Sequence, residues 1–209
     1  MVQSASLPLA YPEAGVIEED SLRDQTLALA SDLPERPLVL GGCCCSHVGA
    51  VEGLATRHDR LAVVWLDAHG DLNTPESSPS GNEWGMPLRM LIDGGAVDAA
   101  DVALVGARNL DPPEEEFIRA SGLQAGDGAI ERVLENVDCV YVAFDADVVE
   151  PRELTVFMPE PDGPMLDEIE QLFRSLQGRA VVVGAGFTGL APDPANVPKL
   201  ERLAAALGL

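Results

Sequence analysis

Short apolar runs, each followed by a helical segment, constrain the fold of this chain more than any other feature. The runs are continuous Val, Ala and Leu stretches, which indicates strands that are buried on both faces. Repeated strand–helix units favour parallel βαβ connections. The sequence therefore predicts an α/β fold, a three-layer α/β/α sandwich with a mainly parallel sheet. Predicted strands cover residues 37–40, 61–66, 102–105, 139–144 and 180–183, and predicted helices cover residues 48–57, 87–93, 130–136, 165–176 and 197–207.

Two acidic clusters follow two of the predicted strands. They consist of Asp67, His69 and Asp71 after residues 61–66, and of Asp145 and Asp147 after residues 139–144. Side chains two residues apart on a strand point the same way, and ligands of parallel sheets bind beyond the carboxyl ends of the strands. We therefore expect the five side chains to meet in one pocket. So many carboxylates repel one another unless a positive charge separates them, which predicts one or two divalent cations. Either cluster alone would be better explained as a solvated turn, so the metal hypothesis rests on both together.

The net charge of the chain argues against two classes of binding partner. The formal net charge of the 209 residues is −22, and Lys199 is the only lysine. Phosphate binding requires Lys and Arg, so neither a nucleic acid nor an anionic membrane is an expected partner. No segment reaches transmembrane length, and residues 1–10 lack the basic and apolar regions of a signal peptide. We expect a single domain in the cytoplasm that acts on a small molecule.

Four cysteines give a second indication of the compartment. Cys43, Cys44 and Cys45 are adjacent and Cys139 is distant. This spacing suits neither a disulfide framework nor a zinc ribbon. The thiols therefore indicate a reducing compartment.

Residues 184–189 fit the pattern G-x-G-x-x-G after a predicted strand. In a dinucleotide-binding fold this pattern opens a helix, but Pro192 and Pro194 follow at once. We therefore assign these glycines a role in packing or in a loop rather than a dinucleotide site.

Further motifs surround the acidic clusters, and together they resemble the arginase–agmatinase (ureohydrolase) family. They are residues 40–42 (LGG), 67–71 (DAHGD), 73–75 (NTP), 80–82 (SGN), 85–87 (GMP), 105–111 (VGARNLD), 144–147 (FDAD) and 150–151 (EP). The resemblance runs from about residue 37 to the C-terminus. It implies one ureohydrolase-like domain over residues 1–209, with the parallel α/β/α sandwich of the family but without its usual N-terminal strand and first helix. The sheet edge that this leaves open predicts a homo-oligomer.

The resemblance also implies a binuclear centre, usually of manganese, at which an activated water attacks the carbon of an amidine or guanidine. Two cations are suited to lowering the pKa of such a water. By position, the implied ligands are Asp67 and Asp145 as bridges, Asp71 on one ion, and His69 and Asp147 on the other. The residues that correspond to substrate contacts are Asn73, Ser80, Asn82 and Asp111. The candidate catalytic residues are Asp71 and Glu83.

Three positions depart from the family pattern. Cys44 stands where the family has a histidine ligand, Trp84 where it has a proton-shuttle histidine, and Gly189 where a glutamate grips the guanidinium. Cys44 is interpreted equally well as a thiolate ligand, which would favour zinc or iron, or as a small buried residue in a turn. The nearby His47 is expected to point elsewhere.

These departures make arginine a poor candidate substrate, because a guanidinium loses its anionic partner and the reaction its proton shuttle. We therefore predict a metal-dependent hydrolase that acts on a C–N bond of another small linear amidine- or guanidine-like compound. One alternative is a degenerate family member that binds metal or a small molecule without turnover. Another is an inactive subunit that assembles with an active paralogue.

Overall fold

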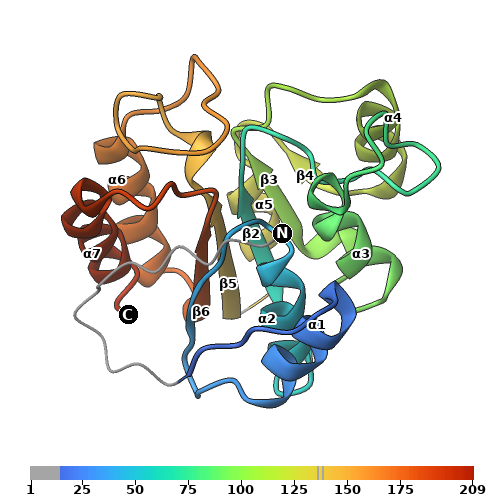
Figure 1. The fold of residues 1–209 in the computed structure, drawn as a ribbon, viewed down its shortest axis with the longest axis horizontal. Helices are drawn as coiled ribbons and strands as arrows, with labels where there is room; N and C mark the ends of the chain where they lie inside the picture. The colour runs from blue at the N-terminus through green and yellow to red at the C-terminus, as the bar shows by residue number, and fades with distance from the viewer. Residues whose placement is uncertain (1–14, 136, 138) are drawn as a thin grey trace.

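The fold is built on one six-stranded sheet. The computed structural model describes residues 15–135, 137 and 139–209 (Figure 1). The strand order is β1-β6-β5-β2-β3-β4, and every neighbouring pair is parallel. The strands are β1 (Leu38–Leu40), β2 (Ala62–Leu66), β3 (Val102–Val105), β4 (Gln124–Ala125), β5 (Cys139–Asp145) and β6 (Val181–Thr188). The helices are α1 (Leu22–Ser31), α2 (Ser46–Ala55), α3 (Pro87–Asp93), α4 (Pro112–Ser121), α5 (Ala129–Leu134), α6 (Leu166–Gln177) and α7 (Val197–Ala206).

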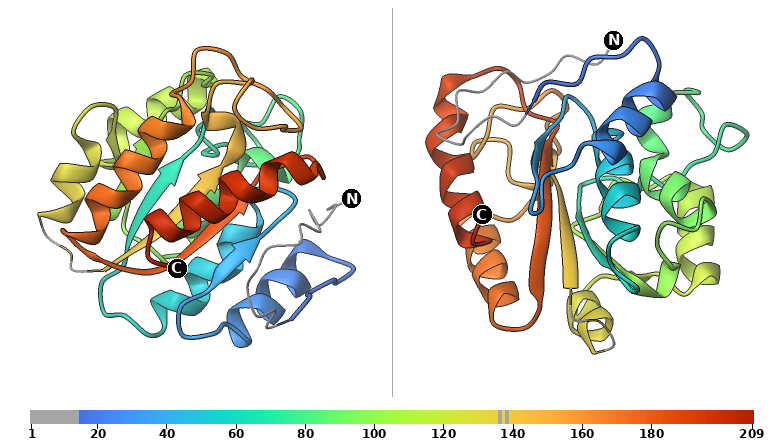
Figure 2. Two further views of the ribbon diagram at one scale, coloured as in Figure 1. Left: turned by 90° about the vertical axis from the view of Figure 1, so that its left-hand side faces the viewer. Right: turned by 90° about the horizontal axis from the view of Figure 1, so that it is seen from below.

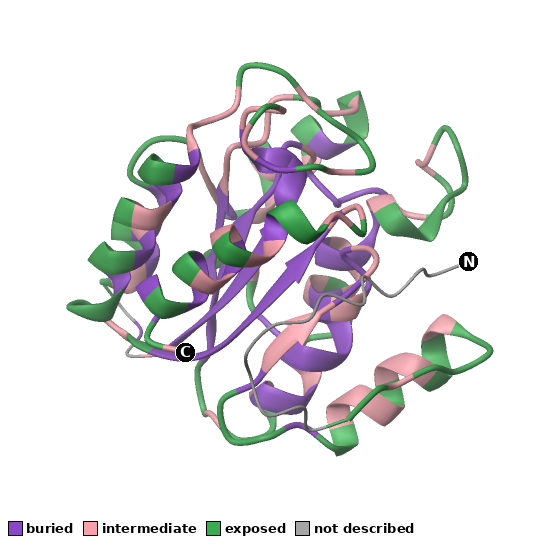
Figure 3. Cartoon of the chain, turned by 60° about the vertical axis from the view of Figure 1, so that its left-hand side comes forward, coloured by how far each residue is buried: buried purple, intermediate pink, exposed green. Residues whose placement is uncertain are grey.

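Helices cover both faces of the sheet. Figure 2 shows α6 and α7 on one face and α1, α2 and α3 on the other. Along β2, Val64 packs in the same core as Phe173 of α6, whereas Trp65 packs in the opposite core with Leu54 of α2. Both faces of the central strands are therefore buried (Figure 3), which explains their continuous apolar sequences. The predicted α/β/α sandwich is confirmed.

Strand β6 is longer than predicted, since it continues beyond residue 183 to Thr188. A Cβ at Gly184 would lie 3.0 Å from the Pro37 ring, and a Cβ at Gly186 would lie 2.5 Å from the His47 ring. Glycine therefore lets the strand pass two close neighbours without interruption. The packing interpretation of these two glycines is confirmed, and the loop interpretation is wrong for them.

Three elements had no predicted counterpart: α1, α4 and the short strand β4. Helix α1 begins after Ser21, whose side chain accepts a hydrogen bond in the first turn. It packs closely on α2, because a Cβ at Gly49 or Gly53 would lie 2.7 Å from a backbone carbonyl oxygen of α1. A helix therefore precedes the first strand, where none was expected.

The remaining predicted strands and helices agree with the structure to within two residues at each end. The last residue of the helix predicted over residues 130–136 lies outside the described residues. None of the helices in the described ranges is long and apolar enough to cross a membrane.

Candidate metal centre

The two acidic clusters meet at the carboxyl edge of β2 and β5. The register pairs Leu66 with Phe144, so Asp67 and Asp145 follow at neighbouring points of this edge. Cys44 joins them from the turn between β1 and α2. We call the whole set the ligand cluster: Cys44, Asp67, His69, Asp71, Asp145 and Asp147. All six residues line one pocket of about 1180 Å³, and its four carboxylates are at most 8% exposed.

The side chains converge through turns rather than through the alternation of a strand. Strand β2 ends before Asp67, and Asp147 lies in a short 3₁₀ helix, Ala146–Val148. Asp67 Oδ1 and Asp145 Oδ1 each accept the N–H two residues further on, at 2.7 and 3.0 Å. Asp147 Oδ1 accepts the N–H of Ala68 at 3.1 Å. The predicted pocket is therefore present, but turns, and not the alternation of side chains along a strand, bring these side chains together.

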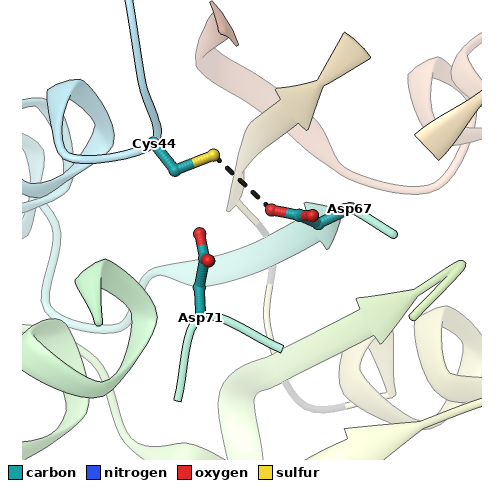
Figure 4. Close-up of side chains that lie close together, drawn as sticks. All are labelled: Cys44, Asp67 and Asp71. Carbon is teal, nitrogen blue, oxygen red and sulfur yellow. Dashed lines mark hydrogen bonds between the residues drawn. The ribbon is translucent and has the colours of Figure 1, made fainter. Parts of the chain in front are cut away.

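Cys44, Asp67 and Asp71 form one group that could hold a metal ion, with ligand atoms within 4.8 Å of one another. Figure 4 shows the three side chains around a common space. Cys44 Sγ lies 3.5 Å from Asp67 Oδ2 and 3.0 Å from Asp145 Oδ2. Asp71 has a positive φ of 53°, and its Oδ2 is buried without a hydrogen-bond partner among the described residues. Buried polar atoms are rarely left unpaired, so we expect this oxygen to have a partner other than the described residues.

Asp67, His69 and Asp147 form a second group of the same kind. His69 Nδ1 lies 3.3 Å from Asp67 Oδ1 and 3.1 Å from Asp147 Oδ2. On the far side of the ring, Nε2 lies 3.5 Å from Glu160 Oε1, which also accepts a hydrogen bond from Asn109 at 3.0 Å. Sequence reasoning missed Glu160, because nothing near it along the chain marks it as a neighbour of His69.

Burial changes the proton affinities of the cluster. It raises the pKa of Asp67, Asp71 and Asp147, and it raises the pKa of Asp145 to about 6. Hydrogen bonds with Asp147 and Asp67 raise the pKa of His69 to about 11. In the metal-free protein, the cluster therefore holds its protons more tightly than the same groups would in water. Divalent cations would replace these protons.

Thr188, at the end of β6, joins the ligand cluster to a neutral group behind it. Its Oγ1 lies 3.2 Å from Cys44 Sγ, from Asp145 Oδ2 and from His47 Nε2. His47 Nδ1 in turn lies 3.0 Å from the Tyr141 hydroxyl. His47 is fully buried and does not line the pocket, as expected, and burial lowers the pKa of His47 to about 3. Sequence reasoning missed Thr188, because the predicted strand stopped five residues too early.

The predicted substrate residues all line the pocket: Asn73, Ser80, Asn82 and Asp111. The Asn73 amide donates to Asp111 Oδ2 at 2.9 Å. Asp111 is also the N-cap of α4 in a capping box with Glu114. A hydrogen bond therefore holds Asn73 and Asp111 together, whereas Ser80 and Asn82 lie on an exposed loop.

The three positions that depart from the family pattern have different surroundings. Cys44 is buried in the cluster, and burial beside Asp145 raises the pKa of its thiol well above the usual value. Trp84 is 54% exposed at the pocket, next to Glu83, which is also exposed. Gly189 has a φ of +71°, and a Cβ there would lie 2.1 Å from Asp145 Oδ1. A glutamate cannot stand at this position without displacing the cluster.

Comparisons with known proteins agree with this geometry. A sequence model of the arginase family matches residues 11–208. Arginase from Staphylococcus aureus strain COL is 36% identical over 142 residues, which cover 56% of this chain and 47% of the relative. The chain thus spans about half the length of the curated relatives it matches.

Solved structures give the same result. The crystal structure of arginase from Bacillus subtilis strain 168 has a TM-score of 0.84 at 26% identity, over 90% of this chain and 78% of that chain. The structure of proclavaminate amidino hydrolase from Streptomyces clavuligerus has a TM-score of 0.76 at 26% identity, over 91% and 71% of the two chains.

Proposed function

Since the chain belongs to the arginase family, we propose that it is a metal-dependent hydrolase of a C–N bond in a small linear amidine- or guanidine-like compound other than arginine. The observation that carries the proposal is the ligand cluster. Four buried carboxylates and one imidazole converge on a pocket, and one buried carboxylate oxygen lacks a partner among the described residues. Such an excess of negative charge suits divalent cations and a cationic substrate.

The ligand cluster fits two divalent ions. We assign Cys44 and Asp71 to one ion, His69 and Asp147 to the other, and Asp67 and Asp145 to the space between them. The unpaired oxygen of Asp71 and the raised pKa values are what cations would relieve. When bound, the ions supply a Lewis acid and a nucleophilic water at neutral pH. Manganese is the first expectation for this family, with zinc or iron as alternatives because of Cys44.

Residues around the pocket would bind the substrate and move its protons. None of the described residues that line the pocket is Lys or Arg, so, apart from His69, an amidinium meets acidic and neutral groups only. We assign the amino end of the substrate to Asp111, neutral hydrogen bonds to Asn73, Ser80 and Asn82, and proton transfer to Asp71 and Glu83.

Arginine fits this pocket poorly. Gly189 leaves no space for an acidic side chain beside Asp145, so a guanidinium would lack a charged partner there. The indole of Trp84 cannot shuttle a proton at neutral pH. The Streptomyces clavuligerus protein, by its name, acts on proclavaminate, which supports the proposal that this fold accommodates substrates other than arginine.

The test is a screen of the full chain, loaded with manganese, against a panel of linear amidines and guanidines. We expect turnover of at least one compound of the panel. The rates on arginine and agmatine should be roughly 10²–10⁴-fold lower than the rate on that compound. The Asp67→Asn variant is the matched control for turnover that depends on the cluster. Ordinary rates of urea release from arginine or agmatine would contradict the choice of substrate. Glu83→Gln would then show whether Glu83 has replaced the missing proton shuttle.

A second candidate function is binding of metal or a small molecule without turnover, which Trp84 and Gly189 favour. It predicts tight metal binding together with no activity on any compound of the panel. The cytoplasmic location and the homo-oligomer also stay predictions, and light scattering of the purified chain measures the latter.

A further inference from the structure

The two groups of candidate ligands differ in chemistry, although they share Asp67. One group contains the sulfur of Cys44 and two carboxylates, whereas the other contains the imidazole of His69 and two carboxylates. Cys43 and Cys45 also line the pocket, but neither belongs to a candidate group among the described residues. Among the described residues, a sulfur atom is therefore present only in the group that contains Cys44 and Asp71.

The surroundings of Cys44 differ from those of a thiol that merely fills a core. Its sulfur lies 3.0 Å from Asp145 Oδ2, 3.5 Å from Asp67 Oδ2 and 3.2 Å from Thr188 Oγ1. Trp65 Nε1 donates to Asp67 Oδ2 at 3.3 Å and Thr188 Oγ1 donates to Asp145 Oδ2 at 3.2 Å, so each carboxylate near the sulfur has one neutral donor. The thiol adds only a single, weakly donated proton. A cation between the sulfur and the carboxylates would supply the positive charge that these neutral donors lack.

Asp71 provides a second and independent indication of a ligand on this side. It is 5% exposed, and its Oδ2 has no hydrogen-bond partner among the described residues. Its backbone adopts the left-handed conformation, with a φ of 53°. Such conformations are costly in residues other than glycine and cluster at functional sites. Here the conformation holds an unpaired carboxylate against Cys44 and Asp67, where Figure 4 shows the three side chains facing one space.

We propose that the pocket holds two unlike ions, with a thiophilic divalent ion such as Zn²⁺, Fe²⁺ or Co²⁺ at the Cys44 end and an ion such as Mn²⁺ at the His69 end. Thiolate ligands select soft metals, and Mn²⁺ binds divalent-metal sites most weakly in the first-row series. Binding at the Cys44 end releases the thiol proton, since only the thiolate ligates. The inference rests on the proposed binuclear centre, and it deepens that proposal by naming the metal class of each position.

The experiment is titration of the metal-free full chain with Co²⁺, followed by ultraviolet and visible absorption. A sulfur-to-cobalt charge-transfer band should rise with one equivalent of the ion. The band should be lost in Cys44→Ser and kept in the matched thiol controls Cys43→Ser, Cys45→Ser and Cys139→Ser. Competition with Zn²⁺ should show that Cys44→Ser weakens zinc binding by more than the roughly 10–100-fold typical of losing an outer partner, whereas Mn²⁺ binding changes less than tenfold.

The outcomes separate this inference from the proposed function. Two bound cobalt ions without a charge-transfer band, or a band that persists in Cys44→Ser, would overturn the inference and leave the binuclear centre standing. A chain that binds neither Co²⁺ nor Mn²⁺ would overturn both. Cys44→His serves as a second variant should Cys44→Ser fail to fold, because it keeps a ligand at this position and should lose the band alone.

Discussion

Two sets of buried polar side chains meet at Thr188, and they differ in how their charge and hydrogen bonds are satisfied. On one side, both ring nitrogens of His47 have partners within the chain, Tyr141 at 3.0 Å and Thr188 at 3.2 Å. The His47 ring also packs edge-on against Trp65 and Tyr141. On the other side, the ligand cluster collects four carboxylates around a single imidazole and leaves Asp71 Oδ2 unpaired among the described residues.

This difference distinguishes buried groups that stabilise the fold from buried groups that are suited to binding a ligand. Buried neutral groups are inexpensive when every donor and acceptor is paired, whereas buried charges are costly without a counter-charge. The set formed by His47, Tyr141 and Thr188, which we call the His47 group, is complete in the chain alone. The ligand cluster, in contrast, leaves one buried carboxylate oxygen without a partner among the described residues, and on our proposal cations would complete it. Stability measurements on the metal-free and metal-loaded protein can therefore test whether the two sets respond differently to metal.

The largest effect is expected from His47→Ala. The substitution leaves a cavity and removes one hydrogen-bond partner from each of Tyr141 and Thr188, which should cost about 4 kcal/mol of unfolding free energy. The loss should be the same with and without metal, since the His47 group does not need the ions. Chemical denaturation measures this loss, with His58→Ala, three residues after the end of α2, as the control. A loss that appears only in the metal-loaded protein would contradict the separation of the two sets.

Metal should stabilise the protein through the ligand cluster. Binding to the folded state alone contributes about 2–4 kcal/mol at saturating concentration. The melting temperature should therefore be higher in manganese or zinc than in EDTA. Asp67→Asn, which removes the carboxylate common to both groups, should abolish most of this difference. A change below one degree in the unsubstituted protein would mean that the cluster does not bind these ions.

The comparison also shows what the sequence could and could not predict. The strands β2 and β5 and the acidic residues after them are local patterns, so the sandwich and the pocket were predictable. Thr188 and Glu160 contact residues 43 and 91 positions away, Asp145 and His69. Such contacts depend on strand register and on loop paths, which local patterns do not encode. The role of Cys44 stayed open for the same reason, because only the fold reveals that its sulfur, at the edge of the core, lies against two carboxylates.

Lowering the pH should reduce the contribution of the His47 group to the free energy of unfolding. Burial lowers the pKa of His47 to about 3 from 6.5, so its contribution to stability is present above pH 6.5 and is lost as the pH falls. At pH 5 the loss is about 2 kcal/mol. The difference in unfolding free energy between the unsubstituted protein and His47→Gln should shrink by this amount between pH 7 and pH 5. Parallel pH curves for the two proteins would refute the prediction.

Glu160→Gln tests whether metal binding by the ligand cluster depends on a residue outside the cluster. Glu160 lies 3.5 Å from His69 Nε2, and Arg108 donates to the carbonyl of Glu160 at 2.9 Å. A carboxylate behind a ligating histidine orients the ring and raises its basicity. We expect about a tenfold loss of metal affinity by calorimetry, or about 1.4 kcal/mol. The control is Asp162→Asn in the same loop, which should leave the affinity unchanged.

The smallest effect on stability is expected from Asp71→Asn, and its sign should differ between the metal-free and the metal-loaded protein. Burial raises the pKa of Asp71 above its usual value, so ionising this carboxyl group costs free energy in the folded, metal-free protein, and stability is lost as the pH rises. An amide needs no proton, and Asn tolerates the positive φ at this position. The metal-free variant should therefore be more stable than the unsubstituted protein by about 1 kcal/mol at pH 8, with a smaller gain at pH 5. With metal present the same change removes a ligand and should destabilise, whereas Asp59→Asn on the surface should do neither. Destabilisation in both states would show that Asp71 is held by the chain itself, and the contrast between the two sets of buried groups would fail at this residue.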